Sequence, residues 1–413
     1  MAREMKNSGV YYLGDIPASW KLSKFKYHAS TRMGETLLSS DTESERTDEY
    51  NIPVYSATLD DSIFGYVRSA KVVLKVNDLV IPARGNSIGC ATIVREPTAT
   101  CTQTTICGRN IKDIHPKFLY FCNWGLKEEW YKFDGSAIPQ ITVAQVDNNT
   151  LALPPLAEQK SIADFLDAKC GEIDGLLADL DAEIKTLTEY KKSIIAETVT
   201  RGLNPNAPMK SSGIPWAESI PAHWTIQKGK YTFTLLQRPV KEDDGVITCF
   251  RDGEVTLRSN RREDGFTMSE KEYGYQGIEP GDLVVHGMDG FAGSIGISDS
   301  RGKATPVLNV LDSNHNKRYL MYYLRNMAYG NVFLALSTGI RVRSCDLSWK
   351  KLGEIRLVLP PMEEQIEIAN YLDSKCAAID QAITDKTQQI ETLKAYKSSL
   401  IYEYVTGKKQ VAI

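Results

Sequence analysis

Cysteine and histidine side chains are the first candidates for chemistry in this sequence. Cys101, Cys107, His115 and Cys122 lie within a short stretch, but their spacing fits no standard structural zinc pattern. The eight cysteines of the chain form no Cys-x-x-Cys pair, the usual mark of a zinc ribbon or a redox site. We therefore expect buried, reduced thiols and no metal on this chain, with a metal cluster of these four residues as the alternative.

Motifs for catalysis and for cofactor binding are missing from the sequence. His28, His223 and His315 have no serine or cysteine context that would support a catalytic triad. There is no phosphate loop of the form G-x-x-x-x-G-K-[ST] and no G-x-G-x-x-G between a strand and a helix. An Asp/Asn-Pro-Pro-aromatic tetrapeptide, expected in an amino-methyltransferase, does not occur either. The sequence predicts a non-catalytic chain without a cofactor of its own.

Length and composition are those of an ordinary globular protein. The 413 residues are too many for one core and suggest about two to four domains. No apolar run approaches the ~20 residues of a membrane span, and the first residues show no signal-peptide pattern. We expect a cytoplasmic protein that does not contact membranes.

The chain contains the same long stretch twice, and this repeat defines its organisation. "LPPLAEQKSIADFLDAKCGEID" (153–174) returns as "LPPMEEQIEIANYLDSKCAAID" (359–380), with 13 of 22 positions identical. A second pair, "SGVYYLGDIPASW" (8–20) and "SGIPWAESIPAHW" (212–224), precedes it in each half. Each half therefore consists of a globular lobe followed by a shared segment.

The shared segment is predicted to be a long helix. Proline pairs at 154–155 and 360–361 fit a helix start, and Gly202 and Gly407 are plausible stops. At ~1.5 Å per residue, some 45 residues would exceed the width of a lobe, so we expect the two apolar stripes to pair with each other. Spacings of three and four predict the seam residues Ile173, Leu177, Leu180, Ile184 and Leu187, and Ile379, Ile383, Ile390 and Leu393.

The predicted fold class is α+β. Glycine-punctuated β-rich runs such as 71–83 and 281–287, and helical stretches at 117–133 and 317–336, predict two α/β lobes. Each lobe is followed by a long helix, and the two helices are expected to pack as an antiparallel coiled-coil pair with pseudo-two-fold symmetry. The expected boundaries are 1–153 for the first lobe, 154–203 for the first helix, 204–358 for the linker and second lobe, 359–407 for the second helix, and 408–413 for the tail.

Charge is distributed unevenly along the chain. Residues 156–200 hold five basic and ten acidic side chains, and residues 361–404 hold four and eight. Because the whole chain carries a net charge of −3, the remainder is net positive by six charges. The acidity thus lies in the predicted helices.

This order of segments resembles the specificity subunit of type I restriction-modification enzymes, and the resemblance covers nearly the whole chain. The "LPPLAEQ" and "LPPMEEQ" helix openings and the two lobe openings, each occurring twice in the same order, carry it. The resemblance implies that each lobe is a target-recognition domain that reads one half of a split, asymmetric sequence in double-stranded DNA. It further implies two adenine-N6 methyltransferase subunits and restriction subunits as partners, with S-adenosylmethionine, ATP and Mg bound by those partners. The repetition agrees with this, since two identical partners require the same docking surface twice.

Under that resemblance, base-reading residues are expected on loops of the lobes, because Arg suits guanine and Asn or Gln suits adenine. In the first lobe the candidates are Tyr55, Ser56, Thr58, Arg84, Asn86, Ser87, Gln140 and Thr142. In the second lobe they are Arg258, Asn260, Arg261, Arg262, His286, Met288, Asp289, Arg341 and Arg343.

Two alternatives remain open from the sequence. The cluster at 258–262 could be a solvated loop paired with Glu263 and Asp264 instead of a DNA contact. The whole chain could also be a non-catalytic coiled-coil scaffold that binds only proteins, with lobes that read no DNA.

Overall fold

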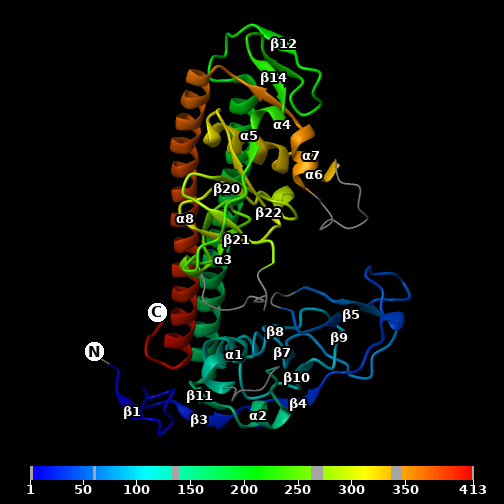
Figure 1. Cartoon of the computed structure of the whole chain (residues 1–413). Coiled ribbons are helices and arrows are strands. Elements are labelled where there is room, and N and C mark those ends of the chain that lie inside the picture. Colours follow the sequence, from blue (N-terminus) through cyan, green and yellow to red (C-terminus); the bar gives the residue numbers. More distant parts are fainter. Residues whose placement is uncertain (1–2, 59–61, 133–138, 262–272, 336–346, 412–413) are drawn as a thin grey trace. The chain divides into compact units, whose positions relative to one another are not determined.

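The computed structural model describes residues 3–58, 62–132, 139–261, 273–335 and 347–411. The chain forms two compact units (Figure 1). The first unit comprises Met1–Asp181 and Thr387–Ile413, and the second comprises Ala182–Lys386. Helix and strand content is mixed in both units, which confirms the α+β class; the domain boundaries expected from the sequence stay a prediction.

Two long helices dominate the structure. α3 spans Leu156–Arg201 and α8 spans Met362–Val405, 46 and 44 residues, so each passes from one unit into the other. Gly202 and Gly407 follow their ends with φ of +75° and +74°. This left-handed backbone terminates a helix at little steric cost only for glycine.

The first unit is built around a four-stranded antiparallel sheet with the order β4-β10-β7-β8. A three-stranded sheet β6-β5-β9 and the pairs β1-β2 and β3-β11 complete its strands. The strands are β1 (Met5–Asn7), β2 (Asp15–Pro17), β3 (Lys21–Lys24), β4 (Ser30–Met33), β5 (Ile52–Tyr55), β6 (Gly65–Val67), β7 (Leu79–Pro82), β8 (Thr92–Ile93), β9 (Thr100–Cys101), β10 (Thr105–Arg109) and β11 (Thr150–Leu153). The short helices are α1 (Pro116–Trp130) and α2 (Val143–Asn148), with 3-10 turns η1 (Phe25–Tyr27) and η2 (Ser39–Asp41).

The second unit repeats this plan with the sheet order β15-β22-β19-β20 and the pairs β12-β13, β14-β23, β16-β17 and β18-β21. Its strands are β12 (Met209–Ser211), β13 (Ser219–Pro221), β14 (Thr225–Lys228), β15 (Thr234–Leu235), β16 (Ile247–Cys249), β17 (Val255–Leu257), β18 (Gln276–Ile278), β19 (Leu283–His286), β20 (Ile295–Ile297), β21 (Gly302–Ala304), β22 (Leu308–Asp312) and β23 (Arg356–Leu359). Its helices are α4 (Gly229–Thr232), α5 (Lys317–Tyr329), α6 (Val332–Ala335) and α7 (Trp349–Glu354), with 3-10 turns η3 (Arg258–Asn260) and η4 (Gly290–Ala292).

One expected strand is shorter than its sequence suggested. The β-rich run 71–83 contains a strand only from Leu79, preceded by a single bridge at Leu74. Asn77 adopts a left-handed backbone with φ of +73°, and the Asp78 carboxylate accepts a hydrogen bond from the Lys75 backbone N–H at 2.8 Å. A tight turn therefore replaces the first half of the run.

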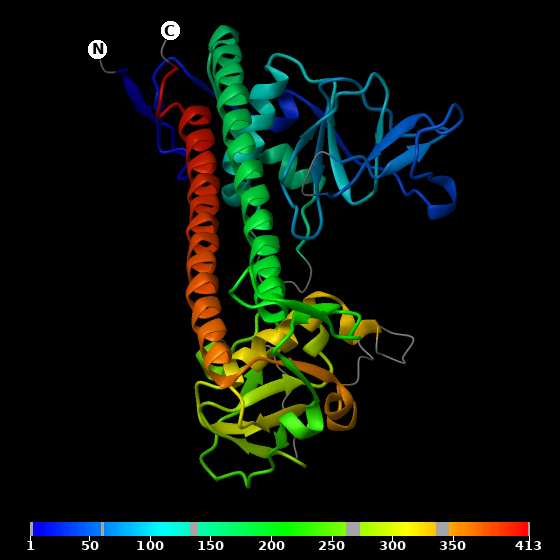
Figure 2. The same cartoon turned by 90° about the horizontal axis from the view of Figure 1, so that it is seen from above.

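The ends of the long helices complete the core of each unit. In the first unit, Leu166 of α3 and Val405 of α8 join a fully buried cluster with Trp20 and Phe118. In the second unit, Leu372 of α8 and Val199 of α3 pack with the fully buried Trp224 and other residues. Each unit thus uses the beginning of one long helix and the end of the other, which lie side by side within it (Figure 2).

Candidate nucleic-acid interface

The three predicted loops of the first lobe lie together in space. The Ser87 hydroxyl donates to the carbonyl oxygen of Ala57 at 3.0 Å, which joins the loop after β5 to the loop after β7. Arg84 forms a β-bridge with Gln140, and the Ile141 N–H donates to the Ala83 carbonyl at 2.9 Å. Residues more than 80 positions apart therefore meet at one edge of the sheet, as a composite reading surface requires.

The candidates of the first lobe differ in how accessible they are. Arg84, Asn86 and Gln140 are exposed, so their side chains can reach a bound molecule. Ser56 and Thr58 are half-buried, and the Ser56 hydroxyl lies 2.9 Å from the hydroxyl of Thr102. The exposed three are the strongest members of this group.

Three first-lobe candidates use their side chains within the fold. Tyr55 belongs to strand β5, and only 5% of it is exposed because its ring packs in an apolar cluster. Ser87 is buried and spends its hydroxyl on Ala57. Thr142 is exposed, but its hydroxyl caps α2 by accepting from the Gln145 N–H, and the Thr142 N–H donates to the Gln145 side-chain oxygen. These residues shape the loops; that they contact DNA stays a prediction.

A row of hydroxyls at the same edge was not among the predicted residues. Thr102 and Thr104 lie next to Ser56, with 2.7 Å between the two threonine hydroxyls. Gln103 between them is exposed. The polar run "TCTQTT" (100–105), unusual between two strands, is the signal that could have identified them.

In the second lobe, the arginine cluster is largely bound to its own fold. The Arg258 Nε donates to the Thr248 hydroxyl at 3.2 Å, and the Asn260 amide donates to the Thr256 hydroxyl at 2.8 Å. Arg261 pairs with Asp252 at 2.6 Å and with Glu254 at 3.2 Å.

The guanidinium of Arg261 also lies over the Phe250 ring, 4.2 Å from its centroid. The alternative expected Glu263 and Asp264 as ion-pair partners, but both lie outside the described residues. The acidic partners of Arg261 in the structure come instead from the turn before β17.

The loop after β19 forms a second cluster near this one. The His286 Nδ1 accepts hydrogen bonds from the N–H groups of Met288 at 3.2 Å and Asp289 at 3.0 Å. Burial, assisted by the charge of Arg251 and opposed by that of Asp289, lowers the pKa of His286. Because Nδ1 accepts two N–H bonds, it carries no proton, and the neutral ring has its proton on Nε2. Met288 is 50% exposed.

The Asp289 carboxylate accepts from Arg251 at 3.0 Å, which joins this loop to the segment that carries Asp252. The Leu347 N–H donates to the Gly287 carbonyl at 2.9 Å, the same contact that Ile141 makes with Ala83 in the first lobe. Both lobes therefore use one backbone arrangement to bring their loops together. Arg262, Arg341 and Arg343 lie outside the described residues.

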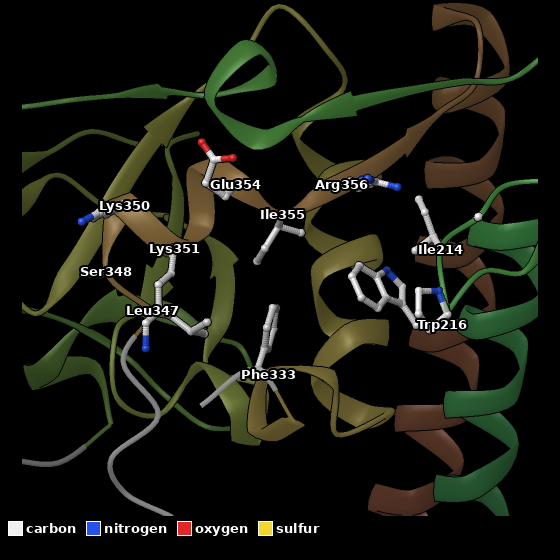
Figure 3. Close-up of a pocket in the computed structure, with 12 residues that line it drawn as sticks. Ile214, Trp216, Phe333, Leu347, Ser348, Lys350, Lys351, Glu354, Ile355 and Arg356 are labelled. Carbon is white, nitrogen blue, oxygen red and sulfur yellow. The ribbon is translucent and has the colours of Figure 1, made fainter. Parts of the chain in front are cut away.

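The second unit also contains an apolar pocket with a volume of about 700 Å³. Phe333 and Ile355 face each other across it, with Trp216 at one side and Lys351 near the other (Figure 3). Glu354 points away from it (Figure 3), and the nearby ammonium groups of Lys228 and Lys230 hold the pKa of its carboxyl at about 2.

The pocket depends on residues that differ between the units. The first unit has Asn149 at the position of Ile355, and its amide donates to the buried Tyr131 hydroxyl at 3.1 Å. The pocket is therefore not part of the repeated framework.

The three thiols of the metal cluster that the sequence left as an alternative are buried. Cys101, Cys107 and Cys122 all belong to apolar clusters, and burial raises the pKa of the Cys122 thiol well above its usual value. Among the residues that the structure describes, no three His, Cys, Asp or Glu side chains converge in a way that would hold a metal ion.

None of the described helices is both long enough and apolar enough to span a membrane.

The nine predicted seam residues are all buried or half-buried in the structure. Ile173, Ile379 and Ile390 are buried, and the other six are half-buried. Ion pairs flank the seam within each unit: Lys397 and Asp174 approach to 2.6 Å in the first, and Lys191 and Asp380 approach to 2.6 Å in the second.

The Glu-Gln pair of the repeated helix opening has a structural task that the sequence did not indicate. Gln159 is buried, accepts from the His115 N–H at 2.8 Å and donates to the Pro154 carbonyl at 2.9 Å. Glu158 accepts from the Trp20 indole N–H at 3.2 Å.

The second unit repeats these bonds with its own residues. Gln365 accepts from Asn316 at 2.9 Å and donates to Pro360 at 2.8 Å, and Glu364 accepts from Trp224 at 3.0 Å. The motif therefore locks each lobe onto the start of its helix, because buried polar groups must find such partners.

Known proteins share both sequence and fold with this chain. Residues 20–186 match the family described as the type I restriction modification DNA specificity domain. The chain is 23% identical over 373 residues to the type I restriction enzyme MjaVIII specificity subunit of Methanocaldococcus jannaschii, which covers 85% of this chain and 83% of that relative. It is 22% identical over 306 residues to the StySPI specificity subunit of Salmonella potsdam, covering 67% of this chain and 65% of that relative.

A chain with the same fold occurs in a solved structure that concerns complex assembly and conformational transition of the type I R-M system. Its TM-score is 0.68 at 14% identity, and the match covers 95% of this chain and 99% of that chain. This protein thus matches the type I restriction modification DNA specificity domain over residues 20–186, and over most of its length it is similar to specificity subunits of type I restriction-modification systems.

Proposed function

We propose that this chain directs a type I complex to a split, asymmetric DNA target, with one lobe for each half of the target. The observation that carries the proposal is a repeated framework with different residues at its loops. Both lobes join their loops by the same backbone contact, yet the first presents Arg84 and Asn86 where the second presents Met288 and a glycine.

These residue differences imply different base preferences. Arginine and asparagine suit the paired acceptors and donors of guanine and adenine. Methionine offers an apolar contact for a thymine methyl group, and the neighbouring Asp289 offers an acceptor for a cytosine amino group. Two unlike half-targets are therefore the expected outcome.

The long helices would then act as the spacer and as the docking site for partners. Ion pairs at positions 174 and 397, and at 191 and 380, support an antiparallel pairing of α3 and α8 as a coiled coil with pseudo-two-fold symmetry. Tyr190 and Tyr396 occupy equivalent positions in the repeat and are 56% and 54% exposed. An exposed aromatic ring that recurs in both units suits a partner that binds twice.

We further propose that the chemistry resides on those partners. Two adenine-N6 methyltransferase subunits would bind S-adenosylmethionine, and restriction subunits would bind ATP and Mg, while this chain would bind none of the three. The complex would work in the cytoplasm. The pairing of Arg261 with Asp252 and Glu254 leaves less free positive charge for phosphate contacts. Weak DNA binding by the isolated chain, tightened by the partners, follows from this.

The test is a map of methylated adenines in genomic DNA from cells with and without this chain. Loss of one asymmetric two-part methylation motif on deletion is the expected result. The protein-only scaffold predicts that every methylated motif is retained while the methyltransferase subunit still co-purifies with the chain, and that result would overturn the proposal.

A further inference from the structure

Exposed apolar side chains recur at equivalent positions in the two lobe openings. Leu22 and Ile226, 204 positions apart, are 42% and 38% exposed, and Tyr27 and Tyr231 at the same spacing are 60% and 69% exposed. Met5 of β1 and Met209 of β12 form a third exposed pair. None of these side chains is needed to fill the core.

The recurrence is specific to this part of the lobes. Single exposed apolar residues are common on protein surfaces and mean little by themselves. Val73 and Val76 of the first lobe are also exposed, but their counterparts are Gly277 and Pro280. The lobe bodies have thus diverged at these positions, whereas the openings have kept three exposed apolar positions; a fourth, Tyr11, is exposed in the first opening but corresponds to Pro215 in the second.

Lysines flank the recurring residues in the same pattern. Lys24 and Lys26 lie between Leu22 and Tyr27 in the sequence. Lys228 and Lys230 lie in the same way between Ile226 and Tyr231. The Lys26 Nζ lies 5.6 Å from the centroid of the Tyr27 ring, and the Lys230 Nζ lies 5.4 Å from that of Tyr231. In the second unit Glu354 pairs with both Lys228 and Lys230, at 2.6 and 2.7 Å, so these three side chains keep one net positive charge. Each unit therefore combines exposed apolar side chains with a net positive charge.

This surface adjoins the start of a long helix in each unit. Lys21 of β3 pairs with Leu153 of β11, three residues before the exposed Leu156 that begins α3. Thr225 pairs with Leu359 in the second unit, three residues before the exposed Met362 of α8. The first turn of each long helix therefore adds an exposed apolar residue shortly after the strand that pairs with the lobe opening.

We infer that the two lobe openings form a duplicated docking surface that binds two copies of one partner polypeptide. Each partner copy contributes an apolar patch with carboxylates at its edge. We call the docking surface the lobe-opening surface; it comprises Met5, Leu22, Lys24, Lys26 and Tyr27 in the first unit and Met209, Ile226, Lys228, Lys230 and Tyr231 in the second. The inference rests on the proposed function, in which the methyltransferase subunit is the partner that occurs twice. It extends the docking site from the helices to the lobes. Nucleic acid is the poorer occupant, since phosphate contact gives no reason to keep methionine, leucine and isoleucine exposed.

The test measures how many methyltransferase subunits the chain binds. Leu22→Asp and Ile226→Asp, singly and together, are mixed with the purified methyltransferase subunit of the same system, and the complexes are examined by native mass spectrometry and titration. In each single variant, the methyltransferase subunit is expected to bind the altered surface at least tenfold more weakly, which gives complexes with one partner. The double variant is expected to bind none. Val76→Asp, an exposed apolar residue outside the surface, is the matched control and is expected to bind two.

A second set of variants separates docking from folding. Tyr27→Ala and Tyr231→Ala remove exposed rings without placing a charge next to the core, and should weaken partner binding while the thermal unfolding temperature stays unchanged. Lys26→Glu with Lys230→Glu should slow association at low salt, with the difference fading at high salt.

The outcomes distinguish this inference from the proposed function. Two partners bound with unchanged affinity by the Leu22→Asp, Ile226→Asp double variant would overturn the inference and leave the proposed function intact. Weaker DNA binding with unchanged partner binding would also overturn it, because the surface would then belong to DNA. A wild-type chain that binds no methyltransferase subunit would instead overturn the proposed function.

Discussion

The Lys397 ammonium group lies 2.6 Å from the Asp174 carboxylate, and the repeat equivalents of these two residues, Lys191 and Asp380, are also 2.6 Å apart. Both residues of each pair are displaced by 206 positions from those of the other. Each copy of the repeat therefore provides the acid of one ion pair and the base of the other. This reciprocal use of one repeat is what an antiparallel helix pair requires.

Charge reversal should expose this reciprocity. Asp174→Lys places two cations together and is expected to lower the free energy of unfolding by at most about 1 kcal/mol, because the aspartate is largely solvated. Adding Lys397→Asp should restore most of that loss. Urea unfolding of the four members of this double-mutant cycle measures the coupling, and no recovery in the double variant would show that the pair is not formed.

The anchoring tryptophans should contribute far more. Trp20 is fully buried and donates to Glu158, so Trp20→Ala is expected to cost about 3–5 kcal/mol of stability. Trp224→Ala should do the same in the second unit. Trp216→Ala is the matched control, since that ring is only half-buried at the rim of the pocket. Denaturant titrations check this, and equal losses for all three would contradict the anchoring role.

Loop substitutions should alter one half of the target at a time. Arg84→Ala with Asn86→Ala is expected to relax base preference by roughly 10- to 100-fold in one half of the methylation motif, since each good base contact provides about 1–3 kcal/mol of discrimination. His286→Ala with Met288→Ala should relax the other half only. Lys75→Ala, exposed but outside the joined loops, is the control. Methylation maps for each variant provide the measurement; a change in both halves from either pair would refute the assignment of one lobe to each half.

Protonation of His286 should destabilise the second lobe. The folded state lowers the pKa of this half-buried ring below the ordinary value of about 6.5, so the unfolded chain binds more protons in that range. Stability should therefore be lost as pH falls below about 6.5 toward the folded pKa. His286→Asn removes this proton while leaving a side-chain acceptor for the Met288 and Asp289 N–H groups. The stability measured between pH 7.5 and 5 should depend less on pH in the variant, and His115 and His315, whose pKa values burial also lowers, contribute to the dependence that remains. Superimposable pH profiles would rule out this role.

Helix length should set the gap between the two half-targets. Inserting seven residues into both α3 and α8 keeps a 3.5-residue seam in register and adds ~10 Å of helix. That length corresponds to about three base pairs, which should be added to the unread spacer while the half-targets stay the same. The methylation map of the variant decides this; an unchanged spacer would exclude the helices as its ruler.

Much of the framework was predictable because it depends on local patterns. Proline pairs, terminal glycines and the spacing of Ile173, Leu177 and Leu180 predicted helices that the structure places at Leu156–Arg201 and Met362–Val405. Such signals act over a few residues, where helix geometry alone determines which side chains share a face. The β-rich run 71–83 was predicted only in part, because a turn at Asn77 replaces its first half.

The candidate site was harder to predict because it is assembled from distant segments. The sequence by itself determined the residue types, the duplication and the two seams. Only the tertiary structure decided that Tyr55 is buried, that Thr142 caps a helix, that Arg261 is bound by Asp252 and Glu254, and that Thr102 and Thr104 join Ser56. Accessibility and pairing depend on which strands meet across a sheet. That is set by the packing of the whole core and not by neighbours along the chain.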